Sequence, residues 1–220
     1  MKKTLLITTG MLLIVTLFTP AAKAQEWDTG LDIYSSYIWR GAKFGSGPAF
    51  QPYVELSAGD FAIGAWGSVS ASMDESLEMD LYASYSFGPV SLTLTDYYFG
   101  GDWMEYSSMH YLEPSVGLSL GDFSFMAAYM FLPEDEDAGT SFGEEGDLYF
   151  EAGYSFGSVD LGLGAGDGQY TDDGEFNVCN IMVGTSKDIE ITEKFTLPVS
   201  GAVILNPSTG GFFITVGLSL

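Results

Sequence analysis

Apolar and polar residues alternate along most of the chain after residue 24. In the clearest segment, 77–87, apolar side chains occupy one parity, while Glu78, Asp80 and Tyr82 occupy the other. Successive side chains of a β-strand point to opposite faces, so this pattern indicates strands with one apolar and one polar face. The predicted strands, about twelve, cover roughly 29–40, 50–57, 61–70, 77–87, 90–98, 111–120, 123–131, 147–156, 159–166, 176–186, 195–206 and 211–220.

The connections between these strands alternate between short and long. Short turns fall at 58–60, 88–89, 121–122 and 157–158, with a somewhat longer one at 187–194. Longer polar connections lie around 41–47, 72–76, 99–110, 132–146, 167–175 and 207–210. Strands of roughly ten residues with this sorting are typical of outer-membrane barrels. A soluble sandwich also alternates, but its strands usually run about 5–6 residues. The prediction is therefore all-β: a transmembrane, antiparallel, up-and-down β-barrel of about 12 strands, forming one domain over 25–220.

Aromatic residues on the apolar parity gather at both strand ends. Those beside the short turns are Trp27, Phe61, Phe87, Phe123, Phe156 and Phe195. Those beside the long loops are Trp39, Phe50, Tyr98, Phe131 and Phe176. Two such belts are expected at the two lipid–water interfaces of a membrane protein. Outer-membrane lipids and lipopolysaccharide are therefore expected partners.

Two places break the alternation. Asp96 falls on the apolar parity of its strand, and the phase changes at 176–178, before Cys179. A bulge or a strand end at each place would absorb the discrepancy. Cys179 itself is expected to pack as a small apolar residue facing lipid.

The first 24 residues have the composition of a secretory signal peptide. Lys2 and Lys3 precede an apolar stretch over 5–18, and Ala22-Lys23-Ala24 supplies the small-x-small cleavage pattern. We therefore expect residues 1–24 to be cleaved and the barrel to be exported to the bacterial outer membrane. Barrel-assembly machinery is then an expected partner during insertion.

Charge and rare residues exclude several functions. The 220 residues hold 30 acidic and 7 basic side chains, for a net charge of −23, with one Cys and one His. Without Lys2, Lys3 and Lys23, only four basic residues remain, so binding to nucleic acid is excluded. Cysteine-based metal sites and paired-histidine motifs are excluded too, and we expect no metal and no cofactor.

The polar parity supplies the candidate pore-lining residues, which are mostly acidic or tyrosine. They are Asp32, Tyr34, Arg40, Tyr53, Glu55, Glu78, Asp80, Tyr82, Glu113 and Glu151. Carboxylates around a pore attract cations, so a narrow porin for small hydrophilic solutes, neutral or cationic, is the favoured function. A filled interior, in which Arg40 and the acids form a hydrogen-bonded network, stays open, because twelve strands lie between filled and channel-forming barrels. Glycines on the same parity favour the pore slightly; they are Gly117, Gly153, Gly162, Gly164 and Gly184.

Two other functions stay open. The first is a closed structural or interaction barrel, whose acidic loops lie at 134–147 and 167–175. Those loops are expected to be solvated surface, with weak binding of divalent cations as the alternative. The second is a lipid-modifying enzyme built on His110, but no nucleophile motif accompanies this histidine, and we expect no enzyme.

The stretch SSYIWRGAKFGSGPAFQP, followed by GAWGS, DLYASYSF and DYYF, resembles the TorF-type porin family of small bacterial outer-membrane barrels. The likeness covers roughly residues 36–99. The matching positions are Ser36, Tyr37, Arg40, Gly41, Pro48, Ala49, Gln51, Gly64, Trp66, Gly67, Ser68, Asp80, Tyr82, Tyr85, Tyr97 and Tyr98. The resemblance implies a small barrel in the outer membrane and a porin-like role.

Overall fold

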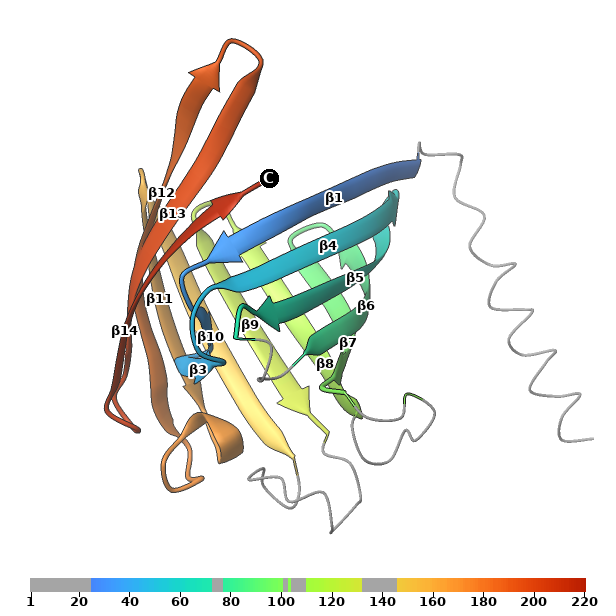
Figure 1. Cartoon of the computed structure of the whole chain (residues 1–220). Coiled ribbons are helices and arrows are strands. Elements are labelled where there is room, and N and C mark those ends of the chain that lie inside the picture. Colours follow the sequence, from blue (N-terminus) through green and yellow to red (C-terminus); the bar gives the residue numbers. More distant parts are fainter. Residues whose placement is uncertain (1–24, 73–76, 101–102, 104–109, 132–145) are drawn as a thin grey trace, which may run out of the picture.

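The computed structural model describes residues 25–72, 77–100, 103, 110–131 and 146–220. Within them, twelve strands close into a barrel in which every strand is antiparallel to its neighbours (Figure 1). The predicted fold class is therefore confirmed. Within the described ranges, no helix is long and apolar enough to cross a membrane. The predicted signal peptide, and the acidic residues predicted at 134–145, lie outside these ranges.

The wall consists of β1 and β4–β14, and β2 and β3 form a separate hairpin. The bounds are β1 (Gln25–Tyr34), β2 (Tyr37–Trp39), β3 (Ala42–Phe44), β4 (Ala49–Ala58), β5 (Phe61–Ser70), β6 (Glu78–Phe87), β7 (Val90–Tyr98), β8 (His110–Leu120), β9 (Phe123–Met130), β10 (Asp147–Phe156), β11 (Val159–Gly166), β12 (Asn177–Thr192), β13 (Phe195–Asn206) and β14 (Gly211–Ser219). A short 3-10 helix, η1 (Gly168–Tyr170), lies between β11 and β12. β1 closes the barrel by pairing with both β4 and β14.

The four predicted short turns are confirmed, each as a two-residue connection between paired strands. In the first of them, Gly59 has a φ of +71°. This left-handed backbone conformation matches the twist of a tight hairpin and favours glycine. The short turns lie at one end of the barrel, called here the turn end, and the opposite end is the loop end.

The barrel wall has its apolar face outward. Leu94 on β7 and Ile214 on β14 are 50% and 63% exposed, whereas the inward Glu113 on β8 is only 3% exposed. A soluble protein would bury the first two and expose the third. This inverted arrangement is that of a barrel whose outer surface contacts lipid.

The hairpin of β12 and β13 projects beyond the rest of the wall at the turn end (Figure 1). β12 pairs with β11 only as far as Thr185, and β13 pairs with β14 only from Val199. Residues 188–198 therefore pair only with each other. The longer turn predicted at 187–194 is therefore wrong: β12 continues to Thr192, with Ile189 and Ile191 keeping the alternation, and the turn is only 193–194.

The two breaks in the alternation have different outcomes. At Asp96 the pairing of β7 with β6 and β8 is continuous, so the expected bulge or strand end is wrong there. Between β11 and β12 the register shifts at Gly164/Ala165, which confirms the bulge expected near 176–179. Cys179 is the residue skipped by this shift, and its exposed fraction is 0%. Its side chain packs inside the barrel, so the prediction that it faces lipid is wrong.

Candidate functional site

The β2–β3 hairpin folds into the barrel and fills its interior near the loop end. Its two strands pair Tyr37 with Phe44 and Trp39 with Ala42, and Arg40 and Gly41 form the tip. Both tip residues have positive φ, +50° and +80°, as a two-residue type I′ turn requires. We call this segment, residues 37–44, the plug hairpin.

Glycine at position 41 lets the tip approach the wall closely. A Cβ atom on Gly41 would overlap the backbone carbonyl oxygen of Cys179 on β12. The backbone of the tip therefore lies directly against β12, on the opposite side of the lumen from β6. Any larger residue at 41 would force the tip away from this strand.

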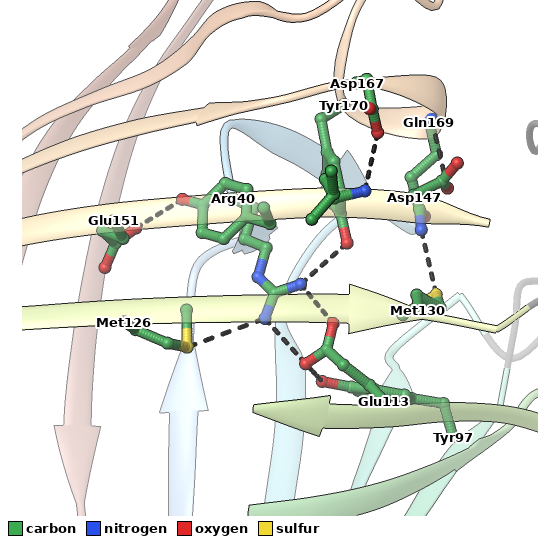
Figure 2. A network of polar contacts seen from close by, with 12 residues as sticks. Arg40, Tyr97, Glu113, Met126, Met130, Asp147, Glu151, Asp167, Gln169 and Tyr170 are labelled. Atoms are coloured by element: carbon green, nitrogen blue, oxygen red, sulfur yellow. Dashed lines mark hydrogen bonds and ion pairs between the residues drawn. The ribbon is translucent and has the colours of Figure 1, made fainter. Parts of the chain in front are cut away.

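Arg40 is held by a buried network of polar groups (Figure 2). Its Nη1 donates to Glu113 Oε2 at 2.5 Å and to the Tyr170 hydroxyl at 2.7 Å, and its Nη2 donates to Glu113 Oε1 at 2.8 Å. The two side chains of the ion pair are 7% and 3% exposed. Tyr97 adds a donor to Glu113 at 3.1 Å. Glu113 therefore accepts three hydrogen bonds, two of them from one guanidinium group, an arrangement stronger than a single contact.

Aromatic rings surround the same guanidinium group. The Arg40 Cζ atom lies 4.4 Å from the ring centroid of Trp39 and 4.3 Å from that of Tyr149. The third ring, of Tyr170, lies 5.5 Å away and is contributed by η1. Cations over aromatic faces are stabilised most where water is excluded. Burial also raises the pKa of the Tyr170 hydroxyl, although Arg40 opposes this shift, so Tyr170 stays a neutral donor or acceptor.

A second polar group on the inner wall lies beside this network. The Tyr149 hydroxyl donates to Glu151 Oε2 at 2.5 Å, and Asn180 Nδ2 donates to the same oxygen at 3.0 Å. Tyr149, Tyr170, Ala128 and Cys179 are buried together as one cluster. The lumen at this height is thus occupied by side chains.

The other flank of the plug hairpin contacts β5 and β6. The Tyr37 ring lies 5.6 Å from that of Trp66, and the Tyr37 hydroxyl donates to Glu78 Oε1 at 3.2 Å. On a further side, the Thr215 hydroxyl of β14 donates to the Ser36 carbonyl at 3.1 Å. Contacts of residues 36–44 therefore reach β5, β6, β8, β12 and β14, and the hairpin crosses the interior of the barrel.

The lumen is more open toward the turn end, where the inward side chains are partly exposed. Glu55 accepts a hydrogen bond from the Tyr82 hydroxyl at 2.9 Å, and Ser155 donates to Asp160 at 2.8 Å. Carboxylates line this part of the lumen. They are Asp28, Glu55 and Asp160.

Tyrosine rings cover several inward glycines, each on a neighbouring strand. A Cβ atom on such a glycine would overlap the ring. The pairs are Tyr34 over Gly217, Tyr53 over Gly30, Tyr82 over Gly64 and Tyr149 over Gly164. Gly164 was expected to leave room for a pore, and the ring of Tyr149 occupies that room. No ring covers Gly184: a Cβ atom placed on it would have its nearest neighbouring atom 3.8 Å away.

All ten predicted pore-lining residues lie on the inward side. Nine belong to the wall, while Arg40 belongs to the plug hairpin, so it spans the lumen instead of lining it. Three of the wall residues, Glu78, Asp80 and Glu113, are buried. Sequence reasoning missed Tyr97 and Tyr170 as partners of this network; Tyr170 lies 130 residues from Arg40 along the chain.

Most of the predicted interface aromatics lie exposed on the outer face. These are Trp27, Phe50, Phe61, Phe87, Phe123, Phe131, Phe156 and Phe195. Trp39 is a correction, because it lies in the plug hairpin, 5.7 Å from the rings of Tyr97 and of Tyr170. The chain leaves the wall at Tyr34, but the alternation continues in phase, so the pattern predicts one unbroken strand. Tyr98 faces outward but is only 8% exposed.

A hydrogen-bonded pair, Asp96 and His110, covers Tyr98 on the outer face. His110 Nδ1 lies 2.9 Å from Asp96 Oδ1, and His110 Nε2 lies 3.3 Å from the Trp103 carbonyl oxygen. The rings of Trp103 and His110 pack against Tyr98 at 4.6 and 5.0 Å. The off-phase Asp96 is therefore balanced by the single histidine on the next strand. The off-phase position of Asp96 is visible in the sequence, but its contact with His110 depends on the register between β7 and β8.

Solved structures that resemble this chain share little of its sequence. No family model matches the sequence, and no curated protein matches it. Outer membrane phospholipase A from Escherichia coli is 12% identical, with a TM-score of 0.44, and the match covers 87% of this chain and 90% of that one. BamA from Haemophilus ducreyi, lacking POTRA domains 1–3, is 12% identical with a TM-score of 0.43, over 84% of this chain and 42% of that one. A chain from work on the asymmetric conductivity of engineered proteins is 14% identical with a TM-score of 0.42. That match covers 78% of this chain, which spans only 55% of the length of that protein.

The fold and the lumen together define a class. The chain forms a twelve-stranded, closed, antiparallel barrel with an exposed apolar outer face. What distinguishes its interior is a hairpin inserted between β1 and β4 and anchored by a buried arginine.

Proposed function

We propose that the protein is a narrow pore of the bacterial outer membrane for small hydrophilic solutes, neutral or cationic, and that the plug hairpin closes it at rest. The observation that carries this proposal is the ion pair between Arg40 on the hairpin and Glu113 on the opposite wall. Solutes pass only when this contact opens.

The outer surface supports a place in the membrane. It combines exposed apolar side chains with aromatic residues near both strand ends, as membrane interfaces favour. On this surface the Asp96 carboxylate has a partner on the next strand, because its Oδ1 lies 2.9 Å from His110 Nδ1. We propose contact with outer-membrane lipids and lipopolysaccharide, and insertion by barrel-assembly machinery after export.

The charge of the lumen supports cationic or neutral solutes. Arg40 is neutralised by Glu113, whereas the carboxylates toward the turn end have no basic side chain among their hydrogen-bond partners in the described residues. Fixed negative charge in a pore raises the local concentration of cations and repels anions. This lumen and the likeness of residues 36–99 to TorF-type porins support the same proposal.

A closed barrel with a structural or interaction role is the second candidate. The observation that favours it is the complete burial of Tyr149 and Cys179 beside the hairpin tip. In that case the hairpin never moves, and the acidic loops form the functional surface. In neither case do we propose an enzymatic activity.

Conductance in a planar bilayer separates the two candidates. We expect low conductance from the wild-type barrel and a larger, cation-favouring conductance from the double variant Arg40→Ala/Glu113→Ala, which removes both halves of the anchor. Ser155→Ala is the matched control, because it removes a lumen hydrogen bond that does not touch the plug hairpin.

Heat-dependent gel migration first verifies that each barrel is folded, so that a change in conductance is not caused by misfolding. A folded but silent double variant would support the closed barrel and overturn the pore. Wild-type conductance equal to that of the double variant would show that the hairpin does not close the pore.

A further inference from the structure

Four buried oxygen-bearing side chains lie on three neighbouring strands of the inner wall, beside the plug hairpin. Gln51 on β4, Ser68 on β5, and Glu78 and Asp80 on β6 are each no more than 6% exposed. Ser68 and Glu78 are direct partners in the register, and Gln51 Nε2 lies 3.5 Å from Ser68 Oγ. We call this group the oxygen pocket.

The two carboxylates of the oxygen pocket have few partners. Asp80 Oδ1 is buried and has no hydrogen-bond partner in the described part of the chain. Glu78 accepts one hydrogen bond from Tyr37. Neither carboxylate forms an ion pair with a described residue, because the donors of Arg40 contact Glu113, Tyr170 and Met126 instead.

Burial of two neighbouring charges without a counter-charge is costly. A divalent cation would neutralise both carboxylates at once. Hard cations such as Ca²⁺ bind carboxylate, amide and hydroxyl oxygens at about 2.3–2.6 Å, in flexible geometries. The oxygen pocket offers all three of these groups.

The spacing of the two carboxylates suits a shared ion. Glu78 and Asp80 are two residues apart on one strand and point to the same face, so their Cα atoms are separated by about 6.6 Å. Two oxygens on opposite sides of a bound Ca²⁺ are separated by about 5 Å, twice the bond length. The described residues contain no group of three or more His, Cys, Asp or Glu side chains arranged for a metal, so neutral oxygens must complete this site.

We propose that the oxygen pocket binds one divalent hard cation, of the Ca²⁺ type, between Glu78 and Asp80, with neutral oxygens from Gln51, Ser68 and Tyr37. Tyr37 belongs to the plug hairpin, so the ion sits between the hairpin and the wall. The site does not depend on whether solutes pass through the barrel.

The test uses the full chain, refolded in detergent and stripped with a chelator. Ca²⁺ is titrated calorimetrically, and Tb³⁺ is used as a luminescent substitute for Ca²⁺. Trp66 is the direct partner of Asp80 in the register, and its ring packs on Tyr37, so both rings can sensitise a lanthanide in this pocket. Excess K⁺ in the buffer keeps weak, non-selective binding to the acidic loops low.

Matched variants assign the ion to the oxygen pocket. We expect Asp80→Asn and Glu78→Gln each to weaken the saturable Ca²⁺ site at least tenfold and to abolish the sensitised Tb³⁺ signal. Glu55→Gln, an inward carboxylate bonded to Tyr82 nearer the turn end, should bind as the wild type does. Heat-dependent gel migration verifies that each barrel is folded. If Asp80→Asn does not fold, the Ca²⁺ affinity of Glu78→Gln decides the test.

Two results would overturn the proposal. The first is the absence of saturable Ca²⁺ binding by the wild type, which would mean that protons neutralise the carboxylates. The second is unchanged affinity in both variants, which would place the ion in the acidic loops. Both readouts measure binding, so they are independent of the conductance that tests the proposed pore.

Discussion

Arg40 and Glu113 form a buried two-point ion pair, with Nη1–Oε2 and Nη2–Oε1 distances of 2.5 and 2.8 Å. Arg40 lies at the tip of an inserted hairpin, and Glu113 lies on β8, so the pair joins the plug hairpin to the wall. A planar guanidinium group matches a carboxylate in this geometry, and lysine would not replace it. This pair is therefore a direct link between the plug hairpin and the wall.

Removing one member of this pair should be strongly destabilising. Arg40→Met leaves the Glu113 carboxylate buried without its counter-charge, and such a change costs about 3–5 kcal/mol. The free energy of unfolding, measured by urea titration in detergent, is expected to fall by this amount. The double variant Arg40→Met/Glu113→Leu should recover most of the loss, because both charges are then gone. Equal stability of Arg40→Met and the wild type would show that the pair does not anchor the hairpin.

Gly41→Ala should displace the hairpin tip, and Gly47→Ala is its matched control. Both glycines have positive φ, +80° and +93°, so both variants pay a similar backbone cost of about 1 kcal/mol. Only at 41 would the new Cβ atom meet backbone, whereas at 47 nothing lies within 4 Å. We therefore expect Gly41→Ala alone to raise bilayer conductance. Similar conductance in the two variants would contradict the close docking of the tip on β12.

Quenching of tryptophan fluorescence by brominated lipids should distinguish Trp27 from Trp39. Trp27 is 67% exposed on the outer face, whereas Trp39 packs inside the barrel against Tyr97 and Tyr170. In variants that keep only one tryptophan, with phenylalanine at the other three positions, lipid quenching is expected for Trp27 and not for Trp39. Strong quenching of Trp39 would return it to the lipid interface that the sequence pattern predicts.

His110→Ala should leave the lipid composition of the host membrane unchanged. His110 Nδ1 contacts Asp96, and its Nε2 faces the Trp103 carbonyl oxygen, an arrangement that holds Trp103 and Tyr98 together. Mass spectrometry of cells that produce the wild type or the variant is the measurement. A lipid species that forms only with the wild type would contradict the prediction that the protein is not an enzyme.

The wall of the barrel could be predicted from the sequence, because strand parity is a local property. Residues 77–87 show it most clearly, and β6 occupies nearly the same positions. The plug hairpin could not be predicted in this way. Its side chains alternate in phase with β1, and the departure from the wall at Tyr34 depends on contacts with distant strands.

The filling of the lumen is even harder to predict from the sequence, because it depends on contacts between residues that are far apart in the chain. Arg40 donates a hydrogen bond to Tyr170, which lies 130 residues away in the sequence. The interior is filled at this height because such distant residues come into contact. Likewise, the off-phase Asp96 signalled a special position, but its pairing with His110 follows from the register of β7 and β8. The alternation along a strand predicts whether a side chain points into or out of the barrel, but it does not predict which residue that side chain contacts.

The most direct test of the plug uses Cys179, the single cysteine of the chain, which lies beneath the hairpin tip. The measurement is the rate at which a water-soluble maleimide labels Cys179 in the folded barrel. We expect no labelling of the folded wild type, complete labelling after unfolding, and labelling of the folded Arg40→Ala/Glu113→Ala variant from the lumen. Rapid labelling of the folded wild type, or no labelling of the folded double variant, would contradict a lumen that the plug hairpin closes.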